Sequence, residues 1–111
     1  MPLLNISTNK DLKNEQKLLA KSSDLISSLL NKSENYVMIK FTDSLPMYFA
    51  GNDDPCCFIE VKSIGSLTPS KISKPICEFF STELGIPNER IYIFYQDIDP
   101  SMWAWNNRTF G

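Results

Sequence analysis

The sequence contains no histidine and little glycine or cysteine. Among its 111 residues there are four glycines and three cysteines, Cys56, Cys57 and Cys77. Without histidine, zinc sites of the Cys/His type and Ser–His or Cys–His nucleophile pairs are excluded. Adjacent cysteines rarely form a disulfide, so we expect three reduced and mostly buried thiols. Proton transfer in this chain therefore needs a carboxylate, lysine, tyrosine, cysteine or an N-terminal amine.

Excess positive charge and long apolar runs are also missing. The formal net charge is −2, which predicts no nucleic-acid or anionic lipid partner. No apolar run approaches the ~20 residues of a membrane span, and no charged segment followed by an apolar one marks a secretory signal. We therefore expect no membrane partner, no metal and no cofactor. The predicted location is the cytoplasm, or outside the cell by secretion without a signal peptide.

What the sequence does contain is the composition of one small folded domain, with 42% hydrophobic residues. The expected elements repeat once, in pseudo-repeats of about residues 2–50 and 56–111. In chain order we expect a strand at 2–7, a helix at 12–31, strands at 36–41 and 56–64, a second helix ending at Gly85, a strand at 91–95 and a short hairpin at 103–110. Apolar positions at helical spacing mark the first helix: Leu12, Leu18, Leu19, Leu25, Ile26, Leu29 and Leu30.

Pro75 leaves the start of the second helix open. It stands either in the first turn, with Ser73 as the cap, or within a longer helix that begins near Pro69. Two strand–helix–strand crossovers of the same hand predict an α+β fold. This fold is a tandem βαβ pseudo-repeat with a four-stranded mixed sheet and two helices on one face. Large apolar groups on the uncovered face predict self-association.

Pro2 is the candidate base. It follows Met1 directly, and a small residue at this position normally permits removal of the initiator methionine. The mature chain would then begin with a secondary amine on a strand. An α-amino group has an ordinary pKa of ~7.7–8.0, within the range useful for proton transfer. Taken alone, Pro2 is more simply an ordinary second residue.

Three further segments give Pro2 a context. They are Asp54-Pro55-Cys56, Ser63-Ile64-Gly65 and the tail from Trp105 to Phe110. With Pro2 and the doubled βαβ order, they resemble the macrophage migration inhibitory factor family of the tautomerase superfamily. The resemblance implies a homotrimer whose sheets form a central β-barrel-like core, with active sites between subunits. It also implies keto–enol tautomerisation of phenylpyruvate or dopachrome-like aromatic keto compounds.

The same resemblance implies roles for individual residues. Pro2 is the general base, Lys32 holds the carboxylate or enol oxygen, and the backbone amide of Ile64 binds the same end of the substrate. Tyr92 is contributed by the adjacent subunit. The aromatic slot is lined by Leu3, Tyr36, Trp105 and Phe110. Most of them have a plainer interpretation as well. Lys32 suits a solvated helix C-terminus, Ile64 suits the core and Tyr92 suits packing in an interface. The residues of the aromatic slot suit ordinary structural roles.

The sequence departs from the family at four positions. Phe94 stands where the mammalian cytokine has an asparagine facing the neighbour's pocket, and a lost hydrogen bond to a hydroxylated substrate costs ~1–3 kcal/mol. Trp103 replaces a smaller residue at the rim and narrows the mouth. Lys62 stands where the mammalian protein has histidine, and it either attracts substrate or is a solvated strand residue. Ile59 interrupts a Cys-x-x-Cys pattern, which argues against a thiol–disulfide oxidoreductase.

Three functional interpretations follow. The first is an isomerase that acts on a small aromatic keto acid. The second is a cytokine-like signalling or interaction protein with weak or vestigial tautomerase activity. The third is a ferredoxin-like ligand-binding domain, which leaves Pro2 and the tail unexplained.

Overall fold

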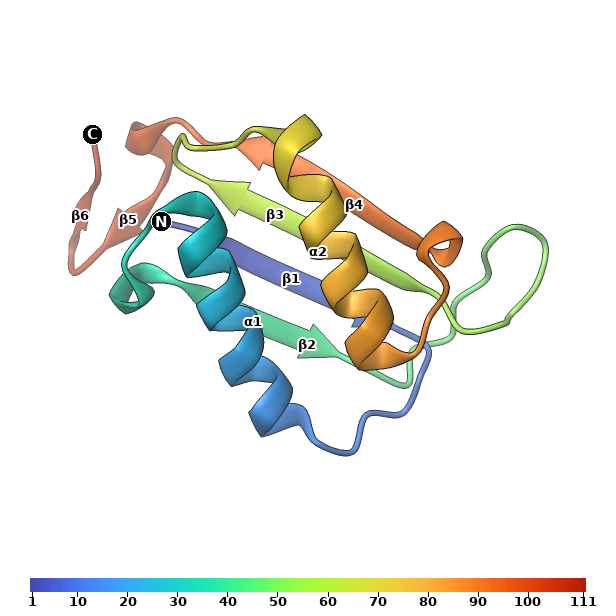
Figure 1. The fold of residues 1–111 in the computed structure, drawn as a ribbon. Coiled ribbons are helices and arrows are strands. Elements are labelled where there is room, and N and C mark those ends of the chain that lie inside the picture. The colour runs from blue at the N-terminus through green and yellow to red at the C-terminus, as the bar shows by residue number, and fades with distance from the viewer.

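In a computed structural model that describes residues 1–111, the chain folds into a four-stranded sheet with two α-helices on one face (Figure 1). Its elements are β1 (Leu3–Thr8), α1 (Glu15–Leu30), β2 (Met38–Thr42), β3 (Cys57–Ser63), α2 (Pro69–Leu84) and β4 (Ile91–Asp97). A separate hairpin of β5 (Ala104–Trp105) and β6 (Arg108–Thr109) follows. The expected α+β class, the doubled strand–helix–strand order and the tail hairpin are confirmed.

The sheet is mixed, in the order β2-β1-β3-β4. Each strand–helix–strand unit joins parallel strands, β1 with β2 and β3 with β4, whereas β1 and β3 are antiparallel. Leu3 lies opposite Met38 on one side and Lys62 on the other. Extending the β1–β3 register by one residue places Pro2 beside Ser63. The chain therefore enters the centre of the sheet at its second residue.

Helix α1 begins later than the apolar pattern predicted. Residue Leu12 precedes it, and the Leu12 N–H donates to Asp43 Oδ2 at 2.9 Å instead of joining the helix. The buried stripe is Leu18, Ser22, Ile26 and Leu30. Ser22 is accommodated there because its hydroxyl donates to the Leu18 carbonyl at 2.7 Å. A serine thus occupies a core position that apolar spacing alone does not reveal.

Helix α2 is the longer of the two alternatives that Pro75 left open. It begins at Pro69, and Pro75 lies inside it. Ser73 is not its cap, because the Ser73 hydroxyl donates back to the Pro69 carbonyl at 2.6 Å. Gly85 ends the helix at φ +66°, a left-handed conformation that favours glycine. The predicted C-terminal stop is therefore confirmed.

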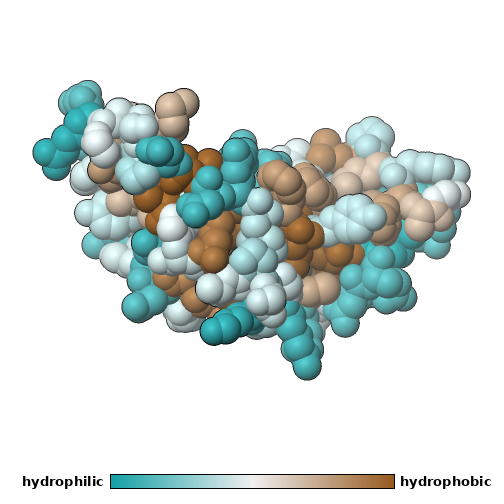
Figure 2. All heavy atoms as spheres, turned by 90° about the horizontal axis from the view of Figure 1, so that it is seen from above, coloured by the Kyte–Doolittle hydropathy of each residue, from teal (hydrophilic) through white to brown (hydrophobic).

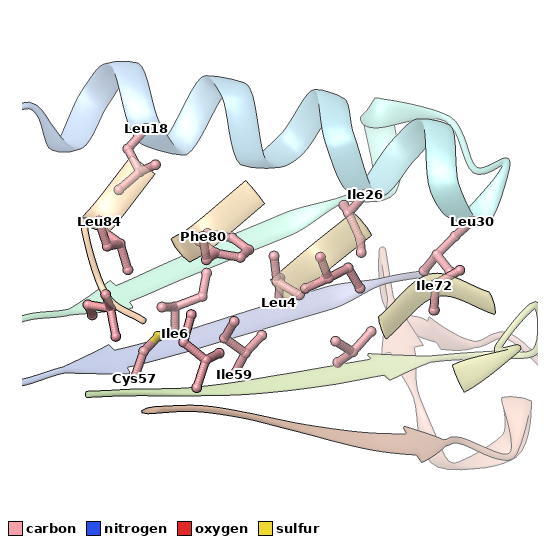
Figure 3. Close-up of a cluster of buried hydrophobic side chains, with 14 residues drawn as sticks. Leu4, Ile6, Leu18, Ile26, Leu30, Cys57, Ile59, Ile72, Phe80 and Leu84 are labelled. Carbon is pink, nitrogen blue, oxygen red and sulfur yellow. The ribbon is translucent and has the colours of Figure 1, made fainter. Parts of the chain in front are cut away.

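The core lies between the helices and the covered face of the sheet (Figure 3). Alternate residues of β1 and β3 enter it, including Leu4, Ile6 and Ile59, each fully buried. Phe80 of α2 is also fully buried. All three cysteines are free thiols, and burial, with Cys56 and Cys77 nearby, raises the pKa of Cys57 to about 12. Cys57 is consequently an apolar core residue and not a reactive thiol.

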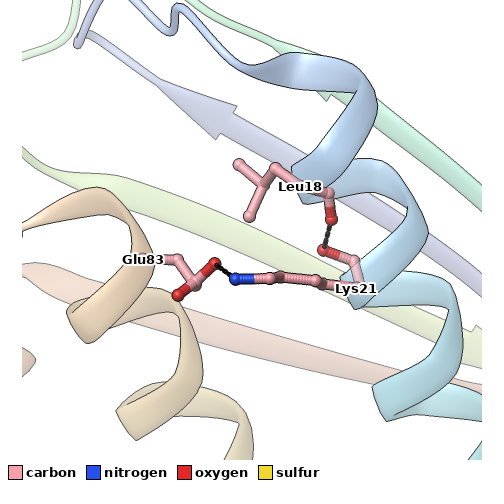
Figure 4. A network of polar contacts seen from close by, with 4 residues as sticks. Leu18, Lys21 and Glu83 are labelled. Atoms are coloured by element: carbon pink, nitrogen blue, oxygen red, sulfur yellow. Dashed lines mark hydrogen bonds and ion pairs between the residues drawn. The ribbon is translucent and has the colours of Figure 1, made fainter.

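One ion pair joins the two helices across their surface. Lys21 of α1 lies 3.0 Å from Oε1 of Glu83 on α2 (Figure 4). Both side chains are partly exposed to solvent, so the pair contributes only about 0.2–1 kcal/mol. Packing of the buried apolar stripes, and not this pair, holds the helices on the sheet. No helix combines the length and apolar character that crossing a bilayer requires.

The uncovered face of the sheet is less apolar than predicted. At its centre Asn5 donates to Glu60 at 3.2 Å, and Glu60 forms an ion pair with Lys62 at 3.6 Å. Large exposed side chains lie nearer the edges, notably Tyr92 and Phe94. Figure 2, which is turned by 90° from Figure 1 and does not look onto this face, shows apolar areas separated by hydrophilic residues. Self-association through this face stays a prediction, and polar contacts would have to be part of it.

Candidate active site

A pocket of about 470 Å³ opens where β1 begins. Its walls come from the first residues of the chain, the segment before β2, the segment after β4 and the C-terminal hairpin, which lies beside the N-terminus in Figure 1. Six of the ten predicted site residues line it: Pro2, Leu3, Tyr36, Trp103, Trp105 and Phe110. The structure thus brings together residues from both ends of the sequence in one largely apolar hollow.

Three aromatic rings form what we call the aromatic wall, made of Tyr36, Trp105 and Phe110. Trp105 and Phe110 are stacked, with centroids 6.3 Å apart and planes within 7°. Tyr36 meets Trp105 edge-on at 5.4 Å. The hairpin positions these rings through a tight turn in which Asn106 and Asn107 both have positive φ. Such a wall suits a flat aromatic ligand.

The segment before β2 explains how Tyr36 reaches the aromatic wall. The sequence predicted a strand from Tyr36, but the structure forms a 3-10 helix, η1 (Glu34–Tyr36), capped by the Ser33 hydroxyl. β2 then begins at Met38, whose N–H donates to the Pro2 carbonyl at 3.0 Å. The predicted strand boundary is therefore wrong by two residues. The extra turn places the tyrosine ring over the hairpin.

Pro2 is almost completely buried, with less than 2% of its surface exposed. It continues the alternation of β1, in which Leu4 and Ile6 also face the helices. The terminal amine in this chain belongs to Met1, and burial, followed by the positive charge of Lys32, lowers its pKa. Both effects disfavour an ammonium at this position. An amine here is thus biased toward its neutral, basic form.

Lys32 and Ile64 lie together beside the amine. The Lys32 ammonium donates to the Ile64 carbonyl at 3.4 Å. Lys32 follows Asn31, which ends α1 in the left-handed conformation and turns the chain back over the sheet. Neither Lys32 nor Ile64 lines the pocket of this chain. The charge of Lys32 nevertheless acts on the amine at the start of the chain.

Tyr92 and Phe94 lie away from the pocket of their own chain. On β4 they stand opposite Phe58 and Glu60, toward the far end of β3. Tyr92 is 63% exposed and meets Phe49 edge-on at 4.8 Å, and Phe94 is 48% exposed. Any contact between these side chains and a substrate in the pocket requires a second chain.

Several pocket residues were not predicted as site residues. Met38, Ile98, Met102 and Lys62 all line the pocket. The signal for Met38 and Lys62 was in the strand alternation, because both lie opposite Leu3 on the uncovered face. Nothing in the local pattern indicated Ile98 or Met102, which reach the pocket through the loop that leads to the hairpin.

Taken together, these features define an α+β domain with a buried proline, the second residue of the chain, in the wall of an apolar pocket. Residues 1–111 match the family described as macrophage migration inhibitory factor (MIF), and the chain belongs to that family.

Known relatives match this chain over almost its full length. A macrophage migration inhibitory factor homolog from Wuchereria bancrofti is 36% identical over 115 residues, covering all of both chains. A crystal structure of a homologue from Prochlorococcus marinus is 39% identical, with a TM-score of 0.93, and covers 98% of this chain and 99% of that one. The factor from Trichinella spiralis is 28% identical, with a TM-score of 0.89, and covers 97% and 99%.

Proposed function

We propose that this chain is a keto–enol tautomerase of small aromatic keto acids, with phenylpyruvate or dopachrome-like compounds as the substrate class. The observation that carries the proposal is the position of Pro2. It lies buried against an apolar pocket with an aromatic wall, where an amine is biased toward its neutral form. Membership of the family is consistent with this activity.

The proposed reaction moves one proton between carbon and oxygen. Neutral Pro2 nitrogen removes a proton from the carbon next to the keto group, and the electron pair of that C–H bond forms the enolate. Negative charge develops on the enolate oxygen, where the Lys32 ammonium and the backbone amide of Ile64 would stabilise it. The protonated proline then returns its proton to the oxygen, which gives the enol. The aromatic wall holds the ring of the substrate and excludes water.

The proposal requires Pro2 to be the first residue of the active chain. While Met1 is attached, the Pro2 nitrogen is part of an amide and has no basicity at neutral pH. Met1 also lines the pocket in this structure. Its removal would therefore both free the base and enlarge the space for substrate.

The test is the tautomerisation of phenylpyruvate by protein whose first residue has been verified as Pro2 by mass spectrometry. We expect catalysis above the buffer rate, with saturation as the phenylpyruvate concentration rises. A folded chain that begins with Pro2 and gives no turnover would contradict the proposal. That result would instead favour the signalling-ligand interpretation.

A homotrimer is part of the proposal, because Tyr92 and Phe94 can reach a pocket only from another chain. Both are exposed on the uncovered face of the sheet, where an apolar side chain gains by burial. We expect light scattering to give three times the monomer mass of 12.7 kDa. A monomer mass at micromolar concentration would contradict the shared site.

A further inference from the structure

Lys62 has the only charged side chain among the residues that line the pocket. It lies on β3 directly opposite Leu3, and by strand alternation its side chain leaves the sheet on the face that the helices do not cover. The remaining walls are almost entirely apolar. A single cation in such a hollow is a natural partner for an anionic group of the ligand, because there is little else for that group to bind.

The Lys62 ammonium is available for such a contact. Its one ionic partner is Glu60, at 3.6 Å, and this separation is too long for a hydrogen bond. The Glu60 carboxylate also accepts a hydrogen bond from Asn5, at 3.2 Å, and neither of these residues lines the pocket. The Lys62 side chain is 34% exposed. An exposed pair of this kind is worth little, so a ligand carboxylate can bind the ammonium without a large cost.

Lys62 and Lys32 come from different elements. Lys32 follows α1 and donates to the Ile64 carbonyl, whereas Lys62 lies on β3 and leaves the sheet on its uncovered face. Of these two cations, only Lys62 lines the pocket. A substrate with two separated anionic groups would match both.

We propose that Lys62 binds a second carboxylate of the substrate, so that this pocket prefers aromatic keto acids with a carboxylate on the ring over uncharged analogues. This inference rests on the proposed tautomerase function. Lys32 holds the keto-acid end of the substrate, and Lys62 holds the carboxylate on the ring from the wall of the pocket.

The test compares two substrates that differ by one charge, phenylpyruvate with a para-carboxylate and phenylpyruvate with a para-carboxamide. For the unmodified chain we expect kcat/KM to favour the carboxylate by about tenfold, the size expected of one charge-assisted hydrogen bond. Lys62→Met is expected to bring the ratio of the two kcat/KM values close to one, whereas Lys62→Arg keeps it. The ratio should also fall as salt is added, because the contact is partly exposed.

Two matched variants control for general charge effects. Lys40→Met removes the same charge from the same sheet face, opposite Asn5 and outside the pocket. Arg108→Met removes the cation of a neighbouring hollow that Trp105 and Phe110 also line. The inference is overturned if the ratio of kcat/KM for the carboxylate to kcat/KM for the carboxamide stays the same in Lys62→Met. It is also overturned if either control variant lowers this ratio as far as Lys62→Met does.

Failure of this inference is distinguishable from failure of the tautomerase function. If neither substrate is turned over by the unmodified chain, the tautomerase proposal fails and this inference fails with it. If both are turned over at a ratio near one, or at a ratio that Lys62→Met leaves unchanged, the tautomerase stands and only the role of Lys62 is wrong.

Discussion

Replacing Pro2 with glycine is expected to lower kcat/KM for phenylpyruvate by about 10²-fold, at the lower end of what a positioned general base contributes. A chain that begins with glycine still has an α-amino group. It lacks the ring that makes the nitrogen a secondary amine and holds it rigid, and it lacks the buried surface that excludes water at this position. The measurement is the initial rate of tautomerisation over a range of phenylpyruvate concentrations, with the first residue verified by mass.

Pro46→Gly is the matched control for this variant. Pro46 lines a different hollow, on the loop after β2, and lies outside the proposed active site. The same exchange there should leave kcat/KM within about twofold, since a surface loop residue contributes little to the site. Equal rates for Pro2→Gly and the unmodified chain would contradict the contribution of the proline ring to the base.

Lys32→Met is expected to lower kcat/KM by about 10²-fold or more, the loss typical of removing one group that stabilises a developing oxyanion.

Lys32→Met should also move the acid limb of the profile of kcat/KM against pH. Burial and the Lys32 ammonium lower the pKa of the terminal amine in this structure, and we expect the same of Pro2 once it is terminal. The proline nitrogen accepts a proton only in its neutral form, which predominates when the pH is above its pKa. Removing Lys32 raises that pKa, so the acid limb moves to higher pH and the loss is greatest at acidic pH.

Two further variants separate charge from structure. Lys32→Arg keeps the positive charge and should keep the acid limb close to its original position. Lys71→Met removes a lysine from the exposed surface of α2, away from the pocket, and should leave the pH profile unchanged. An acid limb that does not move in Lys32→Met would show that Lys32 does not act on the base.

Much of the fold could be predicted because its determinants are local. The helical spacing of Leu18, Ile26 and Leu30 correctly indicated the buried face of α1. Gly85 marked the end of α2 through its own backbone conformation. Such signals depend only on neighbours in the sequence, and a single chain is enough to read them.

The errors come from side-chain hydrogen bonds to the backbone, one between residues far apart in the sequence and one local. Leu12 stays outside α1, and its N–H donates to Asp43, the residue directly after β2. Tyr36 turns out of β2 because Ser33 caps a short 3-10 helix before it. Neither contact leaves a periodic signal, so propensity alone extended the helix and the strand too far.

The sequence predicted some residues of the candidate site and left others open. Pro2 and the tail were recognised by resemblance, and the structure places them around one pocket. Lys62 was more difficult, because the sequence left open whether it attracts substrate or is a solvated strand residue. The structure places it in the wall of the pocket, opposite Leu3.

The most direct test of the account is the tautomerisation of phenylpyruvate by one preparation, before and after an aminopeptidase removes Met1, with the mass followed throughout. No side chain is changed except that of the residue removed. The account predicts that activity rises from the buffer rate in proportion to the fraction of chains that begin with Pro2. Activity that is already complete while Met1 is attached would contradict the role of Pro2 as the base.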